Sequence, residues 1–137
     1  MQARVKLIEG VTWLATADSG HGLVIDGSPE IGGQNRGPRP MELVLQGLAG
    51  CTGMDVVNIL RKARQPVRDC EILVTAERAS TVPQVFTTIH VHYVVSGADL
   101  DEARVAHAVK LSSDTYCSVS RMLQPGVAIT YDFELRP

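Results

Sequence analysis

The apolar segment from Pro40 to Arg64 constrains the fold more than any other part of the chain. Proline suits the first position of a helix, where its missing N–H has no intrahelical partner, and Pro66 stops the helix after Arg64. The first half of the segment is apolar or small on every side, so we expect a helix that is buried all round. Three glycines recur at helical spacing in this segment, at Gly47, Gly50 and Gly53. Each costs up to about 1 kcal/mol in helix propensity, which is tolerated where another backbone packs closely. The helix should therefore lie at the centre of the fold, against a sheet or against a second copy of itself.

Shorter elements are expected on both sides of this helix. A loop over residues 27–40 carries four glycines and three prolines, which favour irregular structure and suggest a functional loop or a partner contact. Asp99 or Asp101 is expected to cap the helix that begins near residue 100. The predicted strands cover residues 3–9, 11–16, 23–26, 67–79, 85–96 and 127–135, and the other helices cover residues 100–112 and 118–124. This order predicts an α+β fold with mostly antiparallel sheets, in a single domain over residues 1–137.

Charge and cysteine content exclude several classes of protein. The net charge is −2 and no basic run occurs, so nothing favours binding to nucleic acid or to an acidic membrane. The N-terminus has no apolar signal core, and the segment 40–64 carries polar residues that argue against a membrane span. Three widely spaced cysteines do not form a secreted disulfide framework. We therefore expect a cytoplasmic protein, in which a cysteine pair is more often catalytic or metal-binding than structural.

Two of the cysteines are candidates for redox chemistry. Cys117 lies near the start of a short helix, where unpaired N–H groups favour a thiolate, and Arg121 follows one turn later. Cys51 lies inside the long helix without such help, and Asp55 one turn on is expected to disfavour its thiolate. Each of the two could instead be a small apolar filler, the commonest role of a buried cysteine. Cys70 begins a strand without any companion motif and is interpreted as structural. If Cys51 and Cys117 meet in the fold, the chain holds a dithiol that can cycle with a disulfide.

A metal site is a competing use of the histidines. His90 and His92 share one face of a predicted strand, an arrangement that can chelate zinc or copper. No second close pair of ligands exists, and histidines on a strand are more often a solvated face. We therefore predict neither a metal nor a cofactor. Hydrolysis by a serine nucleophile is a poor fit because the chain lacks a G-x-S-x-G motif, and no glycine cluster has the setting of a phosphate loop.

Two segments carry a resemblance to a known family. The helix segment Met41–Cys51 and the turn Cys117–Ser120, separated by two strands and a helix, resemble the OsmC/Ohr family of osmotically inducible and organic-hydroperoxide-resistance proteins. The chain looks most similar to an OsmC-like branch of uncertain function whose helix reads C-T-G-M-D-V-V. The resemblance implies an intertwined α+β homodimer with the cysteine-bearing helices at its centre and active sites at the subunit interface. It also implies that Cys51 attacks a peroxide and forms a sulfenic acid, which Cys117 resolves as a disulfide that an external dithiol reduces.

The chain departs from the family at two positions. The family glutamate directly follows the proline that opens the helix, where this chain has Met41 and places Glu42 one residue later. Ten residues along a helix leave two side chains about 80° apart, whereas nine leave them about 180° apart, so Glu42 is expected to point away from Cys51. The family arginine is missing from the turn between the second and third strands. Arg36 and Arg39 are the nearest substitutes, and as a cation at a helix N-terminus Arg39 either binds an anion or is a solvated loop residue.

The function predicted from the sequence is a thiol peroxidase that reduces small organic hydroperoxides in oxidative-stress defence, through Cys51 and Cys117. Arg36, Arg39 and Glu42 are candidates for binding the thiolate or the substrate. The alternative is an OsmC-like dimer without efficient peroxidase activity, which binds a small apolar or thiol-reactive ligand between subunits. The displaced glutamate and the missing arginine favour this alternative.

Overall fold

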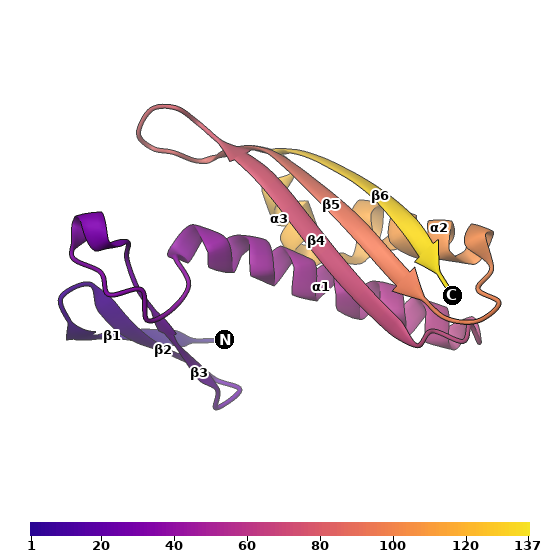
Figure 1. Cartoon of the computed structure of the whole chain (residues 1–137), viewed down its shortest axis with the longest axis horizontal. Coiled ribbons are helices and arrows are strands. Elements are labelled where there is room, and N and C mark those ends of the chain that lie inside the picture. The colour runs from indigo at the N-terminus through magenta and orange to yellow at the C-terminus, as the bar shows by residue number, and fades with distance from the viewer. The chain divides into compact units, whose positions relative to one another are not determined.

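The computed structural model describes residues 1–137 and divides into two compact units, Met1–Gln46 and Gly47–Pro137. The first unit holds an antiparallel sheet in the order β1-β2-β3, followed by a 3-10 turn and the first turns of α1 (Figure 1). Its elements are β1 (Ala3–Glu9), β2 (Thr12–Ala17), β3 (Gly22–Ile25), the turn Pro29–Ile31 and the start of α1 (Pro40–Lys62). All three strands were predicted to within one residue at each end. The expectation of a single domain stays a prediction.

The loop after β3 is organised around one buried carboxylate. Asp26 is 1% exposed and accepts hydrogen bonds from the backbone N–H groups of Gly27, Gln34 and Arg36. Burial opposes its ionisation, but these bonds and one from the Thr12 hydroxyl lower the pKa of Asp26 below its ordinary value. The sequence predicted an irregular loop here. It is irregular apart from one 3-10 turn, but its path is fixed because three of its N–H groups converge on one side chain.

The second unit is a three-stranded sheet with helices packed on one face. The sheet order is β4-β5-β6, in which β4 and β5 are antiparallel and β5 and β6 are parallel (Figure 1). The parallel pair is possible because α2 and α3 connect the two strands. The elements are the rest of α1, β4 (Asp69–Arg78), β5 (Phe86–Ser96), α2 (Glu102–Leu111), a π-helical turn η2 (Ser112–Tyr116), α3 (Ser118–Leu123) and β6 (Ala128–Arg136). The α+β class and the mostly antiparallel sheets are confirmed.

The core of this unit lies between the sheet and the helices. Every second residue of β5 from Ile89 to Val95 is buried, and α1 and α2 supply the facing side chains. The α1 stripe consists of Leu48, Thr52, Val56 and Leu60, and the α2 residues are Val105, Ala108 and Val109. Asp101 caps α2 by accepting hydrogen bonds from the N–H groups of Ala103 and Arg104.

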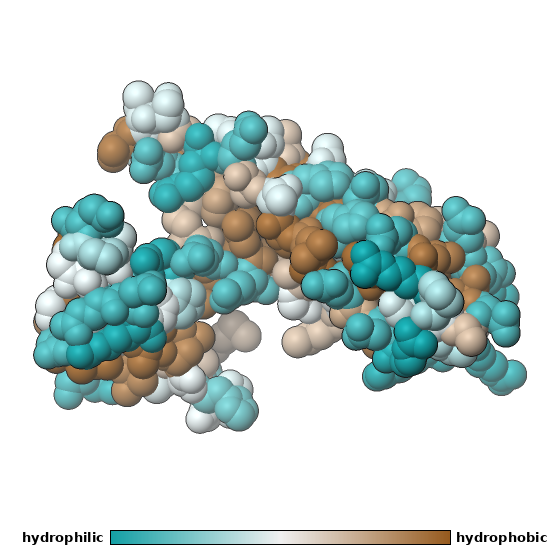
Figure 2. Space-filling view, in the orientation of Figure 1, coloured by the Kyte–Doolittle hydropathy of each residue, from teal (hydrophilic) through white to brown (hydrophobic).

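Within the single chain the long helix is buried on one face only, so its burial on the other faces stays a prediction. The four buried residues of α1 follow each other at intervals of four, and Met54 on another face is 75% exposed. A side chain added at Gly47 or Gly50 would meet nothing within 4 Å, whereas one at Gly53 would touch Ile72. Only Gly53 therefore has a neighbour within reach of an added Cβ, and that contact would be an ordinary van der Waals contact. Figure 2 shows apolar residues at the surface of both units.

One correction concerns membranes. By length and composition α1 is able to cross a bilayer, although the polar residues of this segment argued against a span. Core helices of folded domains pass the same test, and the stripe from Leu48 to Leu60 packs in the core of its unit. We therefore interpret α1 as a core helix.

Candidate active site around two cysteines

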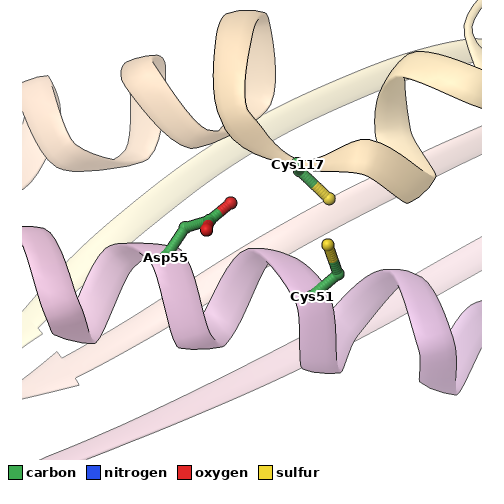
Figure 3. A group of neighbouring side chains, drawn as sticks. All are labelled: Cys51, Asp55 and Cys117. Atoms are coloured by element: carbon green, nitrogen blue, oxygen red, sulfur yellow. The ribbon is translucent and has the colours of Figure 1, made fainter.

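Two cysteines sixty-six residues apart come together in the second unit. Cys51 lies on α1 and Cys117 in the turn between η2 and α3, and Asp55 lies one helical turn after Cys51. The two sulfur atoms and a carboxylate oxygen of Asp55 all lie within 4.8 Å of one another. Figure 3 shows the sulfur atoms pointing toward each other, with the Asp55 carboxylate to one side of them. All three cysteines of the chain are reduced.

The two thiols differ in their access to solvent. Cys117 is 0% exposed, whereas Cys51 is half-buried, so a small molecule can reach Cys51 first. A disulfide needs the sulfur atoms about 2.05 Å apart, so the two side chains must move toward each other to form one. The geometry therefore suits a pair in which Cys51 reacts first and Cys117 follows.

Burial determines the protonation of Cys117. It lies at the start of α3, as predicted, and caps this helix because its sulfur accepts a hydrogen bond from the Ser120 N–H at 3.4 Å. Burial nevertheless raises the pKa of Cys117 to about 11, and the nearby Cys51 thiol adds to this increase. The hydrogen bond from the Ser120 N–H lowers the pKa but does not offset the effect of burial. The prediction that the helix N-terminus favours a thiolate here was wrong in its outcome, because the cost of burying the charge exceeds the gain from the N–H groups. Arg121 donates its backbone N–H to the Cys117 carbonyl, and its side chain is exposed.

A chain of buried hydroxyl groups ends on Asp55. Ser112 donates to the Asp55 carboxylate at 3.0 Å, and the hydroxyl of Thr52 lies 2.7 Å from that of Ser112 and 2.6 Å from that of Tyr93. Each hydroxyl has one proton, and a carboxylate only accepts. Since Ser112 donates to Asp55, Thr52 must donate to Ser112 and Tyr93 to Thr52. Burial raises the pKa of the Tyr93 phenol, although its hydrogen bonds with Ser113 and Thr52 lower it, so Tyr93 keeps its proton.

A pocket opens beside Asp55. It has a volume of about 460 Å³ and combines apolar walls with one cationic residue. Its lining residues are Asp55, Asn58, Ile59, Lys62, Leu111 and Tyr116. The pocket gives a small molecule room next to the carboxylate that adjoins the two sulfurs.

The other predicted site residues have partners within the first unit. Glu42 accepts a hydrogen bond from the backbone N–H of Arg39 at 2.8 Å and so caps the start of α1. The Arg36 side chain pairs with Glu9, and the Arg39 side chain donates to the Asn35 amide oxygen and to the Gly37 carbonyl. Roles for Arg36, Arg39 and Glu42 toward Cys51 stay predictions.

The two histidines share a face of the sheet, as predicted from their spacing. His90 and His92 both bond to the carboxylate of Asp132 on β6, at 3.0 and 2.6 Å. The hydrogen bond that Asp132 accepts from His92 raises the pKa of His92 and lowers the pKa of Asp132. Cys70 is half-buried on β4, and burial raises the pKa of its thiol, to which Asp69 adds.

Sequence reasoning missed most of the surroundings of the thiol pair. Asp55 was considered only as a charge that disfavours the Cys51 thiolate, and no role was assigned to Thr52, Tyr93 or Ser112. The spacing C-x-x-x-D was the available signal for Asp55, because residues four apart on a helix are neighbours. No local pattern marks the three hydroxyl groups, which meet only in the folded chain.

Comparisons with known proteins agree on the fold. The family described as OsmC-like protein matches residues 33–132. The protein YhfA of Escherichia coli strain K12 is 47% identical over 135 residues, which cover 98% of each chain. A hypothetical protein from Aquifex aeolicus is 30% identical with a TM-score of 0.82, over 99% of this chain and 97% of the other. The organic hydroperoxide resistance protein OhrB of Bacillus subtilis is 23% identical with a TM-score of 0.65, over 98% of both chains.

Proposed function

The chain belongs to the OsmC-like family, and on that basis we propose that it is a cysteine-dependent peroxidase for small organic hydroperoxides. The observation that carries the proposal is the convergence of the two sulfur atoms, with Cys51 half-exposed and Cys117 buried. Resistance to organic hydroperoxides is the property that OhrB of Bacillus subtilis is named for. A role in oxidative-stress defence follows from this activity.

Each proposed step of the reaction transfers a defined group. The Cys51 thiolate attacks one peroxide oxygen, the O–O bond breaks, and the alcohol leaves after taking a proton, which forms a Cys51 sulfenic acid. The Cys117 sulfur then attacks the Cys51 sulfur, and water leaves as the disulfide forms. An external dithiol reduces the disulfide and restores both thiols. The cycle needs no cofactor, and the cytoplasm would keep the resting thiols reduced.

We also propose that the protein acts as a homodimer. Large apolar side chains are exposed on the sheet of the first unit, and α1 leaves Met54 and the flank at Gly47 and Gly50 uncovered. Exposed apolar surface of this extent is typical of a protein–protein interface. The exposed side chains of that sheet are Val5, Leu7, Ile8, Trp13, Leu14 and Leu23. A second subunit would cover them.

One observation favours a second function. Arg36, Arg39 and Glu42, the candidates to bind the thiolate or the peroxide, each have a partner in the first unit. A dimer without efficient peroxidase activity could still bind a small apolar or thiol-reactive ligand in the pocket beside Asp55. Such a protein would form the disulfide with an organic peroxide no faster than a free thiol does.

Stopped-flow consumption of cumene hydroperoxide by the wild type and three variants distinguishes these functions. Cys51→Ser should abolish consumption, Cys117→Ser should leave a single turnover that ends in a sulfenic acid, and Cys70→Ser should match the wild type. Mass spectrometry of each product identifies the oxidised sulfur. Wild-type kinetics no faster than those of free cysteine would reject the peroxidase in favour of the ligand-binding protein.

A further inference from the structure

We propose that the reduced protein binds one zinc ion through Cys51, Cys117 and Asp55. In the sequence, only His90 and His92 were candidates for metal ligands, and no metal was predicted. The fold instead gathers two thiols and a carboxylate whose ligand atoms all lie within 4.8 Å of one another. This site goes beyond the peroxidase activity and does not depend on it.

The ligand set matches the chemistry of zinc. Zinc binds cysteine sulfur at about 2.3 Å and carboxylate oxygen at about 2.0–2.2 Å, with tetrahedral geometry. Atoms bound to one such ion stand roughly 3.5–3.8 Å apart. The three ligand atoms here already lie within 4.8 Å of one another, so rotations of side chains close the remaining gap of about 1 Å. Two soft sulfur ligands favour zinc over magnesium or calcium, which prefer sites made of oxygen.

The carboxylate is already oriented for this role. One Asp55 oxygen accepts a hydrogen bond from the Ser112 hydroxyl. Ser112 accepts one from Thr52, and Thr52 accepts one from Tyr93. Such outer hydrogen bonds orient metal ligands, and their loss typically weakens binding by about 10–100-fold. All three hydroxyl groups are buried, so water does not compete for these bonds.

The cluster has a high density of negative charge once its thiols ionise. None of the ion pairs in the chain involves Asp55. A divalent cation compensates this charge, because a metal deprotonates the thiols that coordinate it. The half-buried Cys51 and the pocket beside Asp55 leave one side open to a water molecule as the fourth ligand.

Zinc and oxidation exclude each other at this site. A disulfide forms when the two sulfurs give up two electrons, which the peroxide accepts together with two protons from solvent as it becomes an alcohol and water. The disulfide no longer supplies two thiolates, so the zinc ion is released. Bound zinc in turn occupies the sulfur that would attack the peroxide.

Titration of the reduced full-length protein with Co²⁺, followed by displacement with Zn²⁺, tests the site. The wild type should bind one Co²⁺ per chain and show an intense band from thiolate-to-cobalt charge transfer. Cys51→Ser and Cys117→Ser should each weaken binding by about 100-fold or more, since each removes a thiolate. Asp55→Asn should weaken it by about 10-fold or more, and Ser112→Ala by about 10-fold.

Control variants separate this site from others on the chain. Cys70→Ser, Asp114→Asn and His90→Ala should bind Co²⁺ as the wild type does, because they remove a thiol outside the cluster, an exposed carboxylate and the strand histidine. Asp55→Cys should bind Co²⁺ with a stronger charge-transfer band, which guards against a folding defect in Asp55→Asn. Binding that survives Asp55→Asn unchanged, that disappears in His90→Ala, or that needs two chains per ion would overturn the proposal.

Discussion

Replacing Thr52 by valine tests the hydroxyl chain that ends on Asp55. Valine has nearly the same shape as threonine, so the change removes the hydroxyl and little packing. Thr52 is 1% exposed and makes two short hydrogen bonds, to Tyr93 and Ser112. The variant loses both bonds and leaves the Tyr93 hydroxyl without its acceptor. Tyr93 keeps a longer contact of 3.3 Å with Ser113, and Ser112 keeps its bond to Asp55.

The loss of stability in Thr52→Val follows from the hydrogen bonds that the variant no longer makes. A typical buried hydrogen bond contributes about 1 kcal/mol, and a stranded buried donor costs about 1–3 kcal/mol. Because Tyr93 retains a contact with Ser113, we expect Thr52→Val to lower the free energy of unfolding by about 2–3 kcal/mol. Tyr93→Phe removes one strong hydrogen bond together with its donor, so we expect it to lower the free energy of unfolding by about 1–2 kcal/mol. In the double variant no Tyr93 hydroxyl is left unpaired, so its cost should fall below the sum of the two by about 1 kcal/mol.

Urea unfolding followed by circular dichroism measures all four proteins of this cycle at one protein concentration. Val56→Ala is a useful comparison, because it removes buried atoms one turn along the same stripe without touching a hydroxyl. A loss below about 0.5 kcal/mol for Thr52→Val, or strict additivity in the double variant, would refute the directional chain derived above.

Two further predictions concern pH. Asp26 has a pKa below 3.8 in the folded protein, so its stabilising effect is complete above pH 3.8 and disappears as the pH falls through the lowered value. Asp26→Asn should therefore be less stable than the wild type at neutral pH, with the difference shrinking in acid, and parallel urea-stability curves from pH 2 to 7 would contradict this. His92 has a pKa above 6.5, so its pairing with Asp132 stabilises the fold below pH 6.5 and loses effect as the pH rises through the raised value. NMR titration should show the His92 pKa falling toward 6.5 in Asp132→Asn, and an unchanged titration would exclude Asp132 as the cause.

Most of the secondary structure was predictable because local signals mark it. Pro40 and Pro66 bracket α1, Asp101 caps α2, and alternation of side chains identifies β5. The parallel pairing of β6 with β5 was not specified, because strand order depends on how α2 and α3 return the chain across the sheet. Within the chain only one face of α1 is buried, because composition shows which faces are apolar but not which of them a neighbour covers.

The thiol pair was predictable only through the resemblance to a family. Neither Cys51 nor Cys117 has a close partner in sequence, and spacing alone does not bring residues sixty-six positions apart together. The protonation of Cys117 was misjudged because burial, which depends on the whole fold, exceeds the effect of the helix N-terminus. Asp55 was noted in the sequence, but no role in the site could be assigned to it there, because its hydrogen bond with Ser112 forms only in the folded chain.

The sulfur of Cys117 is the acceptor that completes the first turn of α3, and in the proposed mechanism the same atom reacts. Any partner that bonds to this sulfur competes with the Ser120 amide for its electrons. The rate of amide hydrogen exchange at Ser120 should therefore change when the Cys117 thiol is oxidised or bound, because the loss of this hydrogen bond makes local opening of the turn easier.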